Sequence, residues 1–164
     1  MGKLYLGIEQ HINQSNLIED VRDPNEVVQS LVAWNYLKNQ PFLNLSVVLE
    51  THRLIMKNLL PEKPGRAGSL RLINVQVGRR LCPHYNEVPD LINAWLLKMD
   101  DWWYDLYPIA MHIEFEHIHP FIDGNGRTGR MLLWWHEMKQ GQIPTAIVAS
   151  ASERWDYYSI FDQQ

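Results

Sequence analysis

Cysteine is nearly absent from this chain of 164 residues, since Cys82 is its single example. One thiol can form neither an internal disulfide nor a zinc site built from cysteines. The chain also has no apolar run of about 18 residues or more, and Glu9 and His11 interrupt its first apolar positions. We therefore expect neither a membrane span nor a signal peptide, and the composition indicates a cytoplasmic protein without membrane contact.

Positive charge is scarce as well. Lys and Arg number 15 against 19 Asp and Glu, which gives a formal net charge of −4. This sign argues against a protein that holds nucleic acid by neutralising many phosphates. The stretch from Lys63 to Arg80 is a local exception, because it carries five basic residues and no acidic one. This basic strip is either a solvated loop or a surface that contacts a partner or a phosphate.

Low-complexity segments and internal repeats are also missing, because the nine Gly and nine Pro are scattered singly. Hydrophobic residues make up 46% of the chain, which is enough for one sizeable core. No stretch has the composition of a linker. The sequence therefore predicts a single domain over residues 1–164.

Helical periodicity dominates the chain. The expected helices cover residues 2–20, 23–40, 46–60, 88–103, 106–117, 126–139 and 152–161. Short extended segments around Gly78, within residues 62–85, predict a β-hairpin. The Trp pairs at 102/103 and 134/135 are expected in the core rather than in a base-stacking platform. The predicted fold is mainly α, a helical bundle with a short β-hairpin flap.

The densest polar cluster is residues 117–130, HIHPFIDGNGRTGR. Pro120 and the turn Gly124-Asn125-Gly126 separate two expected helices. A glycine-rich turn at a helix N-terminus presents unpaired backbone N–H groups to an anion. We therefore expect a phosphate site in this loop, at the start of the second helix.

Charged side chains of suitable types flank this turn. Arg127 and Arg130 lie one helical turn apart, close enough to hold a polyphosphate together. Asp123 supplies a hard oxygen ligand suited to Mg²⁺, and His119 is a candidate general base. These are the parts required for phosphoryl or nucleotidyl transfer.

Residues 119–130 resemble the complete signature of Fic proteins, His-x-Phe-x-(Asp/Glu)-Gly-Asn-Gly-Arg-x-x-Arg, and a chance match has a probability on the order of 10⁻⁸. The resemblance implies a Fic-type helical bundle that transfers AMP from Mg²⁺-bound ATP to a Tyr, Ser or Thr hydroxyl of a target protein. It assigns His119 as the base and Asp123 as the magnesium ligand. It assigns the phosphates of the nucleotide to Gly124, Asn125, Gly126, Arg127 and Arg130.

Residues 62–85 resemble the flap of the same family, which binds a segment of the target as an added strand. The residues that carry this resemblance, and that we expect to contact the target, are Gly68, Arg71, Val75 and Val77.

The segment from Ser15 to Asp20 resembles the family's inhibitory pattern, (Ser/Thr)-x-x-x-Glu-(Gly/Asn), within an inhibitory helix expected over residues 1–22. On this interpretation Glu19 pairs with Arg130 and blocks productive binding of the γ-phosphate. Asp20 departs from the pattern, since Gly or Asn is usual there. Without the signature, this segment would be an ordinary solvated helix end.

Alternative functions share the same loop. These include removal of AMP from a modified target and phosphorylation of the kind performed by Doc toxins, although Doc toxins replace the small residues that remain intact here as Gly124 and Gly126. A non-catalytic helical module that senses nucleotide is a third alternative. Regulation is expected either through Glu19 or through an antitoxin partner or self-association.

A metal-dependent hydrolase is a further alternative. His112, Glu116 and His119 are spaced to share one helix face, but the chain has no His-Glu-x-x-His pattern. The remaining histidines are expected to be ordinary core or surface residues.

Overall fold

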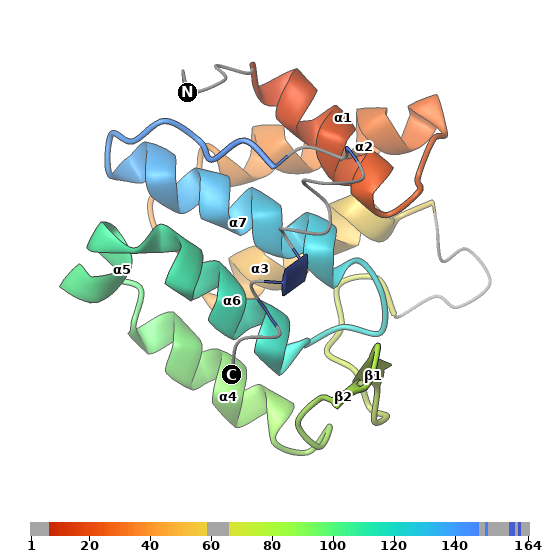
Figure 1. The fold of residues 1–164 in the computed structure, drawn as a ribbon, viewed down its shortest axis with the longest axis vertical. Coiled ribbons are helices and arrows are strands. Elements are labelled where there is room, and N and C mark those ends of the chain that lie inside the picture. The colour runs from red at the N-terminus through yellow and green to blue at the C-terminus, as the bar shows by residue number, and fades with distance from the viewer. Residues whose placement is uncertain (1–6, 59–65, 148–149, 151–157, 160, 162–164) are drawn as a thin grey trace.

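Figure 1 shows the computed structural model of the chain, which describes residues 7–58, 66–147, 150, 158–159 and 161. Within these residues the elements are α1 (Ile8–Ile18), α2 (Pro24–Leu37), α3 (Leu45–Met56), β1 (Gln76–Val77), β2 (Arg80–Leu81), α4 (Val88–Leu97), α5 (Trp102–Leu106), α6 (Pro108–Ile118) and α7 (Asn125–Lys139). The predicted fold class, mainly α with a short hairpin, is confirmed. None of the described helices has the length and apolar character needed to cross a membrane.

Local sequence signals explain where several helices begin. The side chain of Asp23 accepts a hydrogen bond from the backbone N–H of Asn25 at 2.9 Å, directly before Pro24 at the start of α2. Asn44 caps α3 in the same way, through a 2.9 Å bond from the N–H of Val47. Such caps satisfy N–H groups that have no acceptor within the helix.

Helix α7 runs through the middle of the bundle, in light blue in Figure 1, and packs against α1, α2, α3 and α6. Trp134 and Trp135 of this helix are buried, as predicted. Because α7 is covered on most sides, both its apolar and its charged side chains lie inside the protein. The loop that joins α6 to α7 therefore leads into a largely enclosed helix.

The expected continuous helix over residues 88–103 is wrong, because α4 ends at Leu97 and α5 begins at Trp102. The side chain of Asp101 accepts from the N–H of Trp103 at 2.9 Å and so caps a new helix. This break turns the first Trp pair outward, with Trp102 66% and Trp103 47% exposed. These two side chains are therefore not part of the core.

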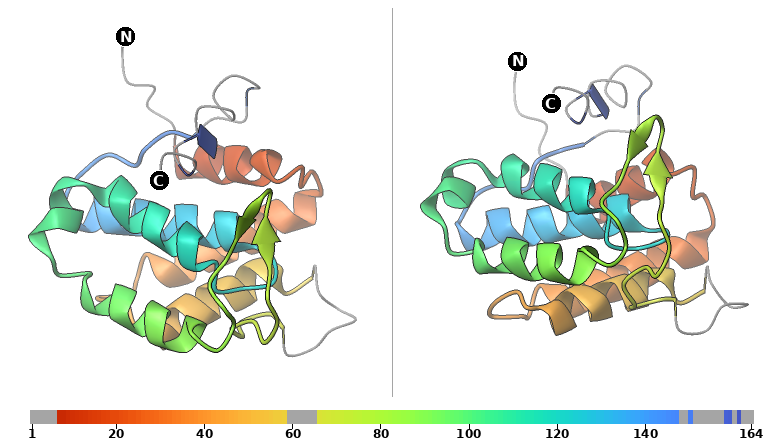
Figure 2. Two further views of the ribbon diagram at one scale, coloured as in Figure 1. Left: turned by 60° about the horizontal axis from the view of Figure 1, so that its bottom comes forward. Right: turned by 90° about the horizontal axis from the view of Figure 1, so that it is seen from below.

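The predicted hairpin is present as an antiparallel pair in which Val77 faces Arg80. Gly78 supplies the positive φ, 57°, that its two-residue loop requires. Figure 2 shows the hairpin beside the loop that joins α6 to α7. Most of the helix expected at 152–161 lies outside the described residues, as do residues 1–6 and 62–65 of the expected inhibitory helix and flap.

Candidate active site

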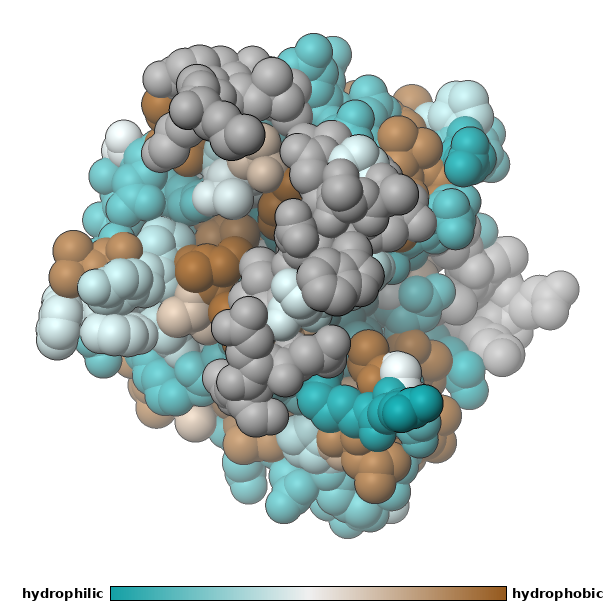
Figure 3. Space-filling view, in the orientation of Figure 1, coloured by the Kyte–Doolittle hydropathy of each residue, from teal (hydrophilic) through white to brown (hydrophobic). Residues whose placement is uncertain are grey.

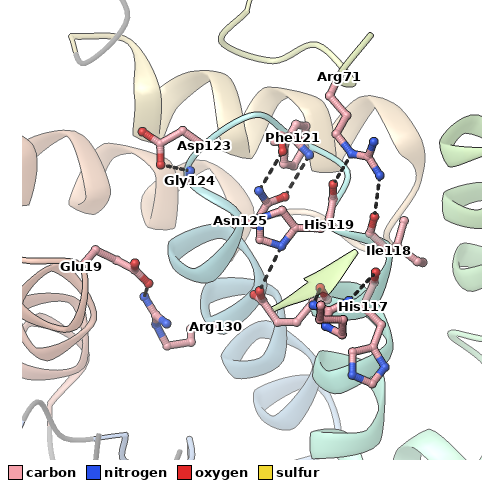
Figure 4. A network of polar contacts seen from close by, with 12 residues as sticks. Glu19, Arg71, His117, Ile118, His119, Phe121, Asp123, Gly124, Asn125 and Arg130 are labelled. Atoms are coloured by element: carbon pink, nitrogen blue, oxygen red, sulfur yellow. Dashed lines mark hydrogen bonds and ion pairs between the residues drawn. The ribbon is translucent and has the colours of Figure 1, made fainter. Parts of the chain in front are cut away.

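The loop between α6 and α7 is held in shape by one buried side chain. Asn125 accepts a hydrogen bond from the N–H of Phe121 and donates one to its carbonyl, both at 2.9 Å (Figure 4). Asn125 is only 2% exposed, so its side chain braces the loop rather than reaching toward a phosphate. Its backbone N–H, in the first turn of α7, belongs to the set that a helix leaves free for an anion.

Two glycines at this helix start have no room for a side chain. Gly124 packs against Met56 and has a φ of 77°, a conformation that L side chains rarely adopt. A Cβ atom on Gly126 would collide with the Glu19 carboxylate and lie 2.9 Å from Nη1 of Arg130. Gly126 therefore lines a hollow at the helix N-terminus, next to a buried guanidinium group.

The side chain of Asp123 is exposed next to this hollow. One carboxylate oxygen accepts the N–H of Gly124 at 2.6 Å, which orients the carboxylate at the start of the cradle. Oxygen ligands of this kind suit Mg²⁺ that is also bound to phosphates. The residues present therefore fit a magnesium ion bound together with a nucleotide.

His119 follows α6 directly and has a left-handed backbone, with φ 49° and ψ 62°. Its Nδ1 lies 3.8 Å from a carboxylate oxygen of Glu116. Burial lowers the pKa of His119 to about 4, and the positive charges of Arg80 and Arg71 act in the same direction. His119 is therefore neutral at pH 7, which is the form that can accept a proton.

Glu116 is a second titratable group at the site, one that the sequence indicated only as a metal ligand. Its side chain is buried, and burial raises its pKa to about 7. Among the described residues, no group of His, Cys, Asp and Glu is arranged to hold a metal ion. The described residues therefore do not support the alternative of a metal face formed by His112, Glu116 and His119. The spacing of three residues between Glu116 and His119 was the available signal for their proximity.

Arg130 is fully buried and binds α1, as Figure 4 shows for Glu19. Its Nη2 donates to Glu19 Oε1 at 2.7 Å and to the carbonyl of Ser15 at 3.1 Å. Its Nε donates to the hydroxyl of Ser15 at 2.8 Å. The structure thus brings together Ser15, Glu19 and Arg130, the three residues singled out by the inhibitory pattern.

The backbone at Asp20 accounts for the residue type that is usual at this position. Asp20 has a φ of 56° and donates its N–H to the carbonyl of Leu17, while Val21 donates to Asn16. This is the left-handed helix end that favours Gly or Asn and that Asp also tolerates. Asp20 therefore allows the helix end that directly follows Glu19.

Arg127 is buried in the first turn of α7 and contacts α3. It is 4% exposed, and its Nη2 contacts Sδ of Met56 on α3 at 3.2 Å. Its Nε and Nη1 have no hydrogen-bond partner among the described residues. The two guanidinium groups thus have different partners in this structure, Met56 for Arg127 and α1 for Arg130. Arg127 nevertheless retains buried donors that an anion would satisfy.

A cavity of about 840 Å³ joins these parts. It is lined by Glu19, Glu116, His119, Gly126 and Arg130, by residues 77–80 of the hairpin, and by Tyr158 and Phe161. Figure 3 shows hydrophilic and hydrophobic surface side by side over the hairpin. The hairpin therefore forms one wall of the cavity that contains the candidate base.

The four flap residues have different positions. Val77 is 41% exposed and lines the cavity, and Val75 is half-buried. Gly68, with a φ of 77°, packs against α3 so closely that a Cβ would lie 2.7 Å from Cβ of Arg53. Arg71 is 1% exposed and donates to backbone carbonyls. Arg71 is thus internal, not a surface contact for a target as expected, whereas Gly68 is half-buried against α3.

His52 on α3 supports the loop, a role that the sequence did not indicate. Its Nδ1 accepts the N–H of Gly68 at 2.8 Å, so its Nε2 carries the proton and donates to the carbonyl of Asp123 at 2.9 Å. Its ring stacks on Phe121 with centroids 3.6 Å apart. Burial lowers the pKa of His52 to about 4, so this neutral tautomer persists at pH 7.

Comparison with known proteins supplies independent evidence. The family model described as "Fic/DOC family" matches residues 42–136. The protein adenylyltransferase fic-1 of Caenorhabditis briggsae is 30% identical over 175 residues, and the match covers 95% of this chain and 32% of that protein. The protein adenylyltransferase Fic of Aedes aegypti is 28% identical, with 85% and 29% covered. This chain spans about a third of the length of these curated relatives.

Solved structures agree with these matches. Fic-1 from C. elegans superposes with a TM-score of 0.68 at 26% identity, covering 96% of this chain and 50% of the other. A Fic family protein from Desulfovibrio desulfuricans has a TM-score of 0.69 at 22% identity, with 94% and 53% covered. The second likeness establishes the fold alone.

Proposed function

This chain belongs to the Fic/DOC family, and on that premise we propose that it transfers AMP from ATP to a Tyr, Ser or Thr hydroxyl of a target protein. The observation that carries the proposal is the neutral His119 in one cavity with the Gly126 hollow and Arg130. This arrangement supports transfer to a hydroxyl, because it sets a base beside an anion cradle.

His119 takes the proton of the attacking hydroxyl in this mechanism. Its Nδ1 faces Glu116 at 3.8 Å, which leaves Nε2 as the accepting atom. The hydroxyl oxygen forms a bond to the α-phosphorus while the bond from that phosphorus to the bridging oxygen breaks. Pyrophosphate leaves with the bonding electron pair, and His119 becomes an imidazolium beside the Glu116 carboxylate.

The loop and α7 bind the phosphates. The backbone N–H groups at the start of α7 and the donors of Arg127 face the anion, which Gly126 admits because it has no side chain. Asp123 would hold Mg²⁺, which neutralises phosphate charge and thereby assists departure of pyrophosphate. Fixed donors at these positions require little reorganisation during the reaction.

Glu19 inhibits the reaction in this proposal, because it occupies Arg130. The pair joins a fully buried guanidinium to a carboxylate that is 33% exposed, at 2.7 Å. A γ-phosphate that uses the same guanidinium must first displace Glu19. Hundredfold inhibition requires a bias of only about 2.7 kcal/mol toward the blocked state. The pair lies within one chain, which supports internal inhibition over dependence on an antitoxin.

Intact-mass spectrometry with Mg²⁺ and ATP tests the proposal on the Glu19→Gly variant and a cell lysate. We expect this variant to gain, or to add to a lysate protein, about 329 Da for each AMP, whereas phosphorylation adds about 80 Da. Glu9→Gly makes the same change on the exposed start of α1 and should leave the protein as inactive as the parent.

His119→Ala distinguishes catalysis from nucleotide sensing. Combined with Glu19→Gly, it should abolish transfer while ATP affinity, measured by calorimetry, stays within about twofold. ATP binding without mass gain in any variant would instead favour a nucleotide-sensing module. Loss of 329 Da from a modified target would indicate AMP removal.

A further inference from the structure

Helix α6 ends immediately before the candidate base, and its end has an unusual set of partners. The last four carbonyl groups of a helix have no N–H donor within that helix. Here the N–H of His119 bonds to the carbonyl of Phe115 at 3.0 Å. The four carbonyls without such a donor therefore belong to Glu116, His117, Ile118 and His119.

Two arginines from the hairpin segment bind all four carbonyls. Arg80 donates to Glu116 at 3.1 Å and to His117 at 3.3 Å. Arg71 donates to the carbonyl of His119 at 2.8 Å and to that of Ile118 at 3.4 Å, contacts that Figure 4 shows. Each guanidinium group thus bridges two consecutive carbonyls, which requires the forked arrangement of donors that only arginine has.

Arg71 is also tied to the rest of its own segment. Its remaining donors reach the carbonyls of Ile73 at 3.0 Å and Pro83 at 2.6 Å, before and after the hairpin strands. Its backbone N–H donates to the carbonyl of Pro120 at 2.9 Å. Arg71 therefore links the residues before and after the hairpin strands to the carbonyls of Ile118, His119 and Pro120.

Electrostatics favours these positions. No ion pair of Arg71 or Arg80 with a carboxylate is present among the described residues. The carbonyl end of a helix carries partial negative charge, which stabilises a cation placed there. The partial negative charge of the helix end, rather than a carboxylate, thus stabilises the charges of the two arginines.

The conformation of His119 depends on the same contacts. Its φ of 49° is a left-handed conformation that costs about 1–2 kcal/mol for a residue with a Cβ atom. Arg71 donates a hydrogen bond to the carbonyl of His119 itself, and Arg80 donates to the carbonyls of the preceding turn, which carries Glu116. If these bonds were lost, the helix end would relax and the imidazole ring would move with it.

We propose that Arg71 and Arg80 are positioning residues that hold His119 in place for proton transfer. The hairpin segment then aligns the base in addition to lining the cavity. This inference rests on the proposed role of His119 as the base. It differs from the expectation that these arginines contact the target or a phosphate. The burial of Arg71 opposes that expectation directly.

Arg80→Gln is the main test, because Arg80 is half-buried and its replacement is compatible with folding. Gln removes the charge and cannot bridge two carbonyls. Arg66→Gln is the matched control, since it removes one charge from the same segment and leaves all four carbonyl bonds intact. Both variants carry Glu19→Gly, and circular dichroism confirms that each is folded.

Titration of the His119 ring by NMR reports how the arginines act on the base independently of activity. The charged groups that act on this ring are Glu19 on α1 and the two arginines, while the Glu116 carboxylate on α6 lies 3.8 Å from it and Arg130 on α7 lines the same cavity. Because the arginines lower the pKa of His119, Arg80→Gln should raise it. Arg66→Gln should leave the titration unchanged.

Kinetics provides the second measurement. We expect Arg80→Gln to lower kcat on the order of tenfold to a hundredfold, since small misplacements of a catalytic group have effects of this size. ATP affinity and KM for the target should stay within about twofold. Arg71→Lys, which keeps the charge but loses the fork, should lower kcat in the same way.

An unchanged His119 titration and kcat in Arg80→Gln would overturn the proposal, as would an equal effect of Arg66→Gln. A loss confined to KM would assign Arg80 to target contact instead. If the Glu19→Gly parent itself transfers no AMP, the proposed function fails. The NMR titration then still decides whether Arg80 acts on the His119 ring.

Discussion

Replacing His52 with Phe separates the structural support of the active-site loop from its chemistry. Phe keeps the stacking on Phe121 but can neither accept the N–H of Gly68 nor donate to the carbonyl of Asp123. A buried polar group that loses its partner costs about 1–3 kcal/mol. We expect His52→Phe to lower the free energy of unfolding by about 3 kcal/mol at pH 7.

The pH dependence of this loss provides an independent estimate. Burial lowers the pKa of His52 from 6.5 to about 4 in the folded protein. A lowered pKa means that the unfolded chain binds the proton first, so the stabilisation is complete above pH 6.5 and is lost as the pH falls through 4. This difference between the pKa values of the unfolded and folded states corresponds to about 3 kcal/mol of the free energy of unfolding. The destabilisation caused by His52→Phe should therefore almost vanish near pH 4.

Urea unfolding of the parent and variant between pH 7.5 and pH 4.5 tests this expectation. The other buried histidines titrate in both proteins, so their effect cancels in the difference. His84→Phe is the control, because His84 is exposed and its replacement should change the free energy of unfolding only slightly. A destabilisation by His52→Phe that stayed constant over this range would refute the assigned tautomer and its two hydrogen bonds.

Two further predictions concern α6 and α7. Glu116→Gln should lower kcat at pH 8 by about tenfold and remove the rise in activity through pH 7. Because its pKa is raised to about 7, Glu116 is protonated below that pH and cannot stabilise the His119 imidazolium there. A pH–rate profile of the variant that keeps this rise would contradict the role of Glu116. Gly129→Ala should destabilise the protein by about 1–3 kcal/mol in thermal unfolding, since its Cβ would lie 2.6 Å from Oε1 of Glu116 and 2.9 Å from Cδ1 of Phe115. Full stability of Gly129→Ala would show that α6 and α7 can separate without cost.

Local sequence signals predicted much of the fold. The Asp23-Pro24 start of α2, the hairpin at Gly78 and the glycine turn before α7 all follow from backbone preferences of a few adjacent residues. The break between α4 and α5 was missed because Trp102 and Trp103 continue an apolar stripe, while the decisive feature was one cap at Asp101. Periodicity describes which face is apolar but not where a helix restarts.

The site residues show the same difference between local and long-range signals. The signature residues and the Glu19–Arg130 pair were identified because two short segments of the chain resemble sequence patterns of the family. The roles of His52 and Arg71 depend on partners 71 and 48 positions away in the sequence. No local pattern indicates that a histidine or an arginine will be buried against distant carbonyl groups, so His52 was expected to be an ordinary histidine and Arg71 to contact the target.

The basic strip shows how burial changes the meaning of a charge pattern. Of its five residues, Arg71 and Arg80 are committed to the end of α6, and Lys63 lies outside the described residues. Arg79 is exposed beside the cavity, in the turn next to Val77. The surface on which a target would bind is therefore narrower and more apolar than the charge run indicates. Target selection should then depend on the edge of β1 and on Arg79, because Arg71 and Arg80 already bind the end of α6.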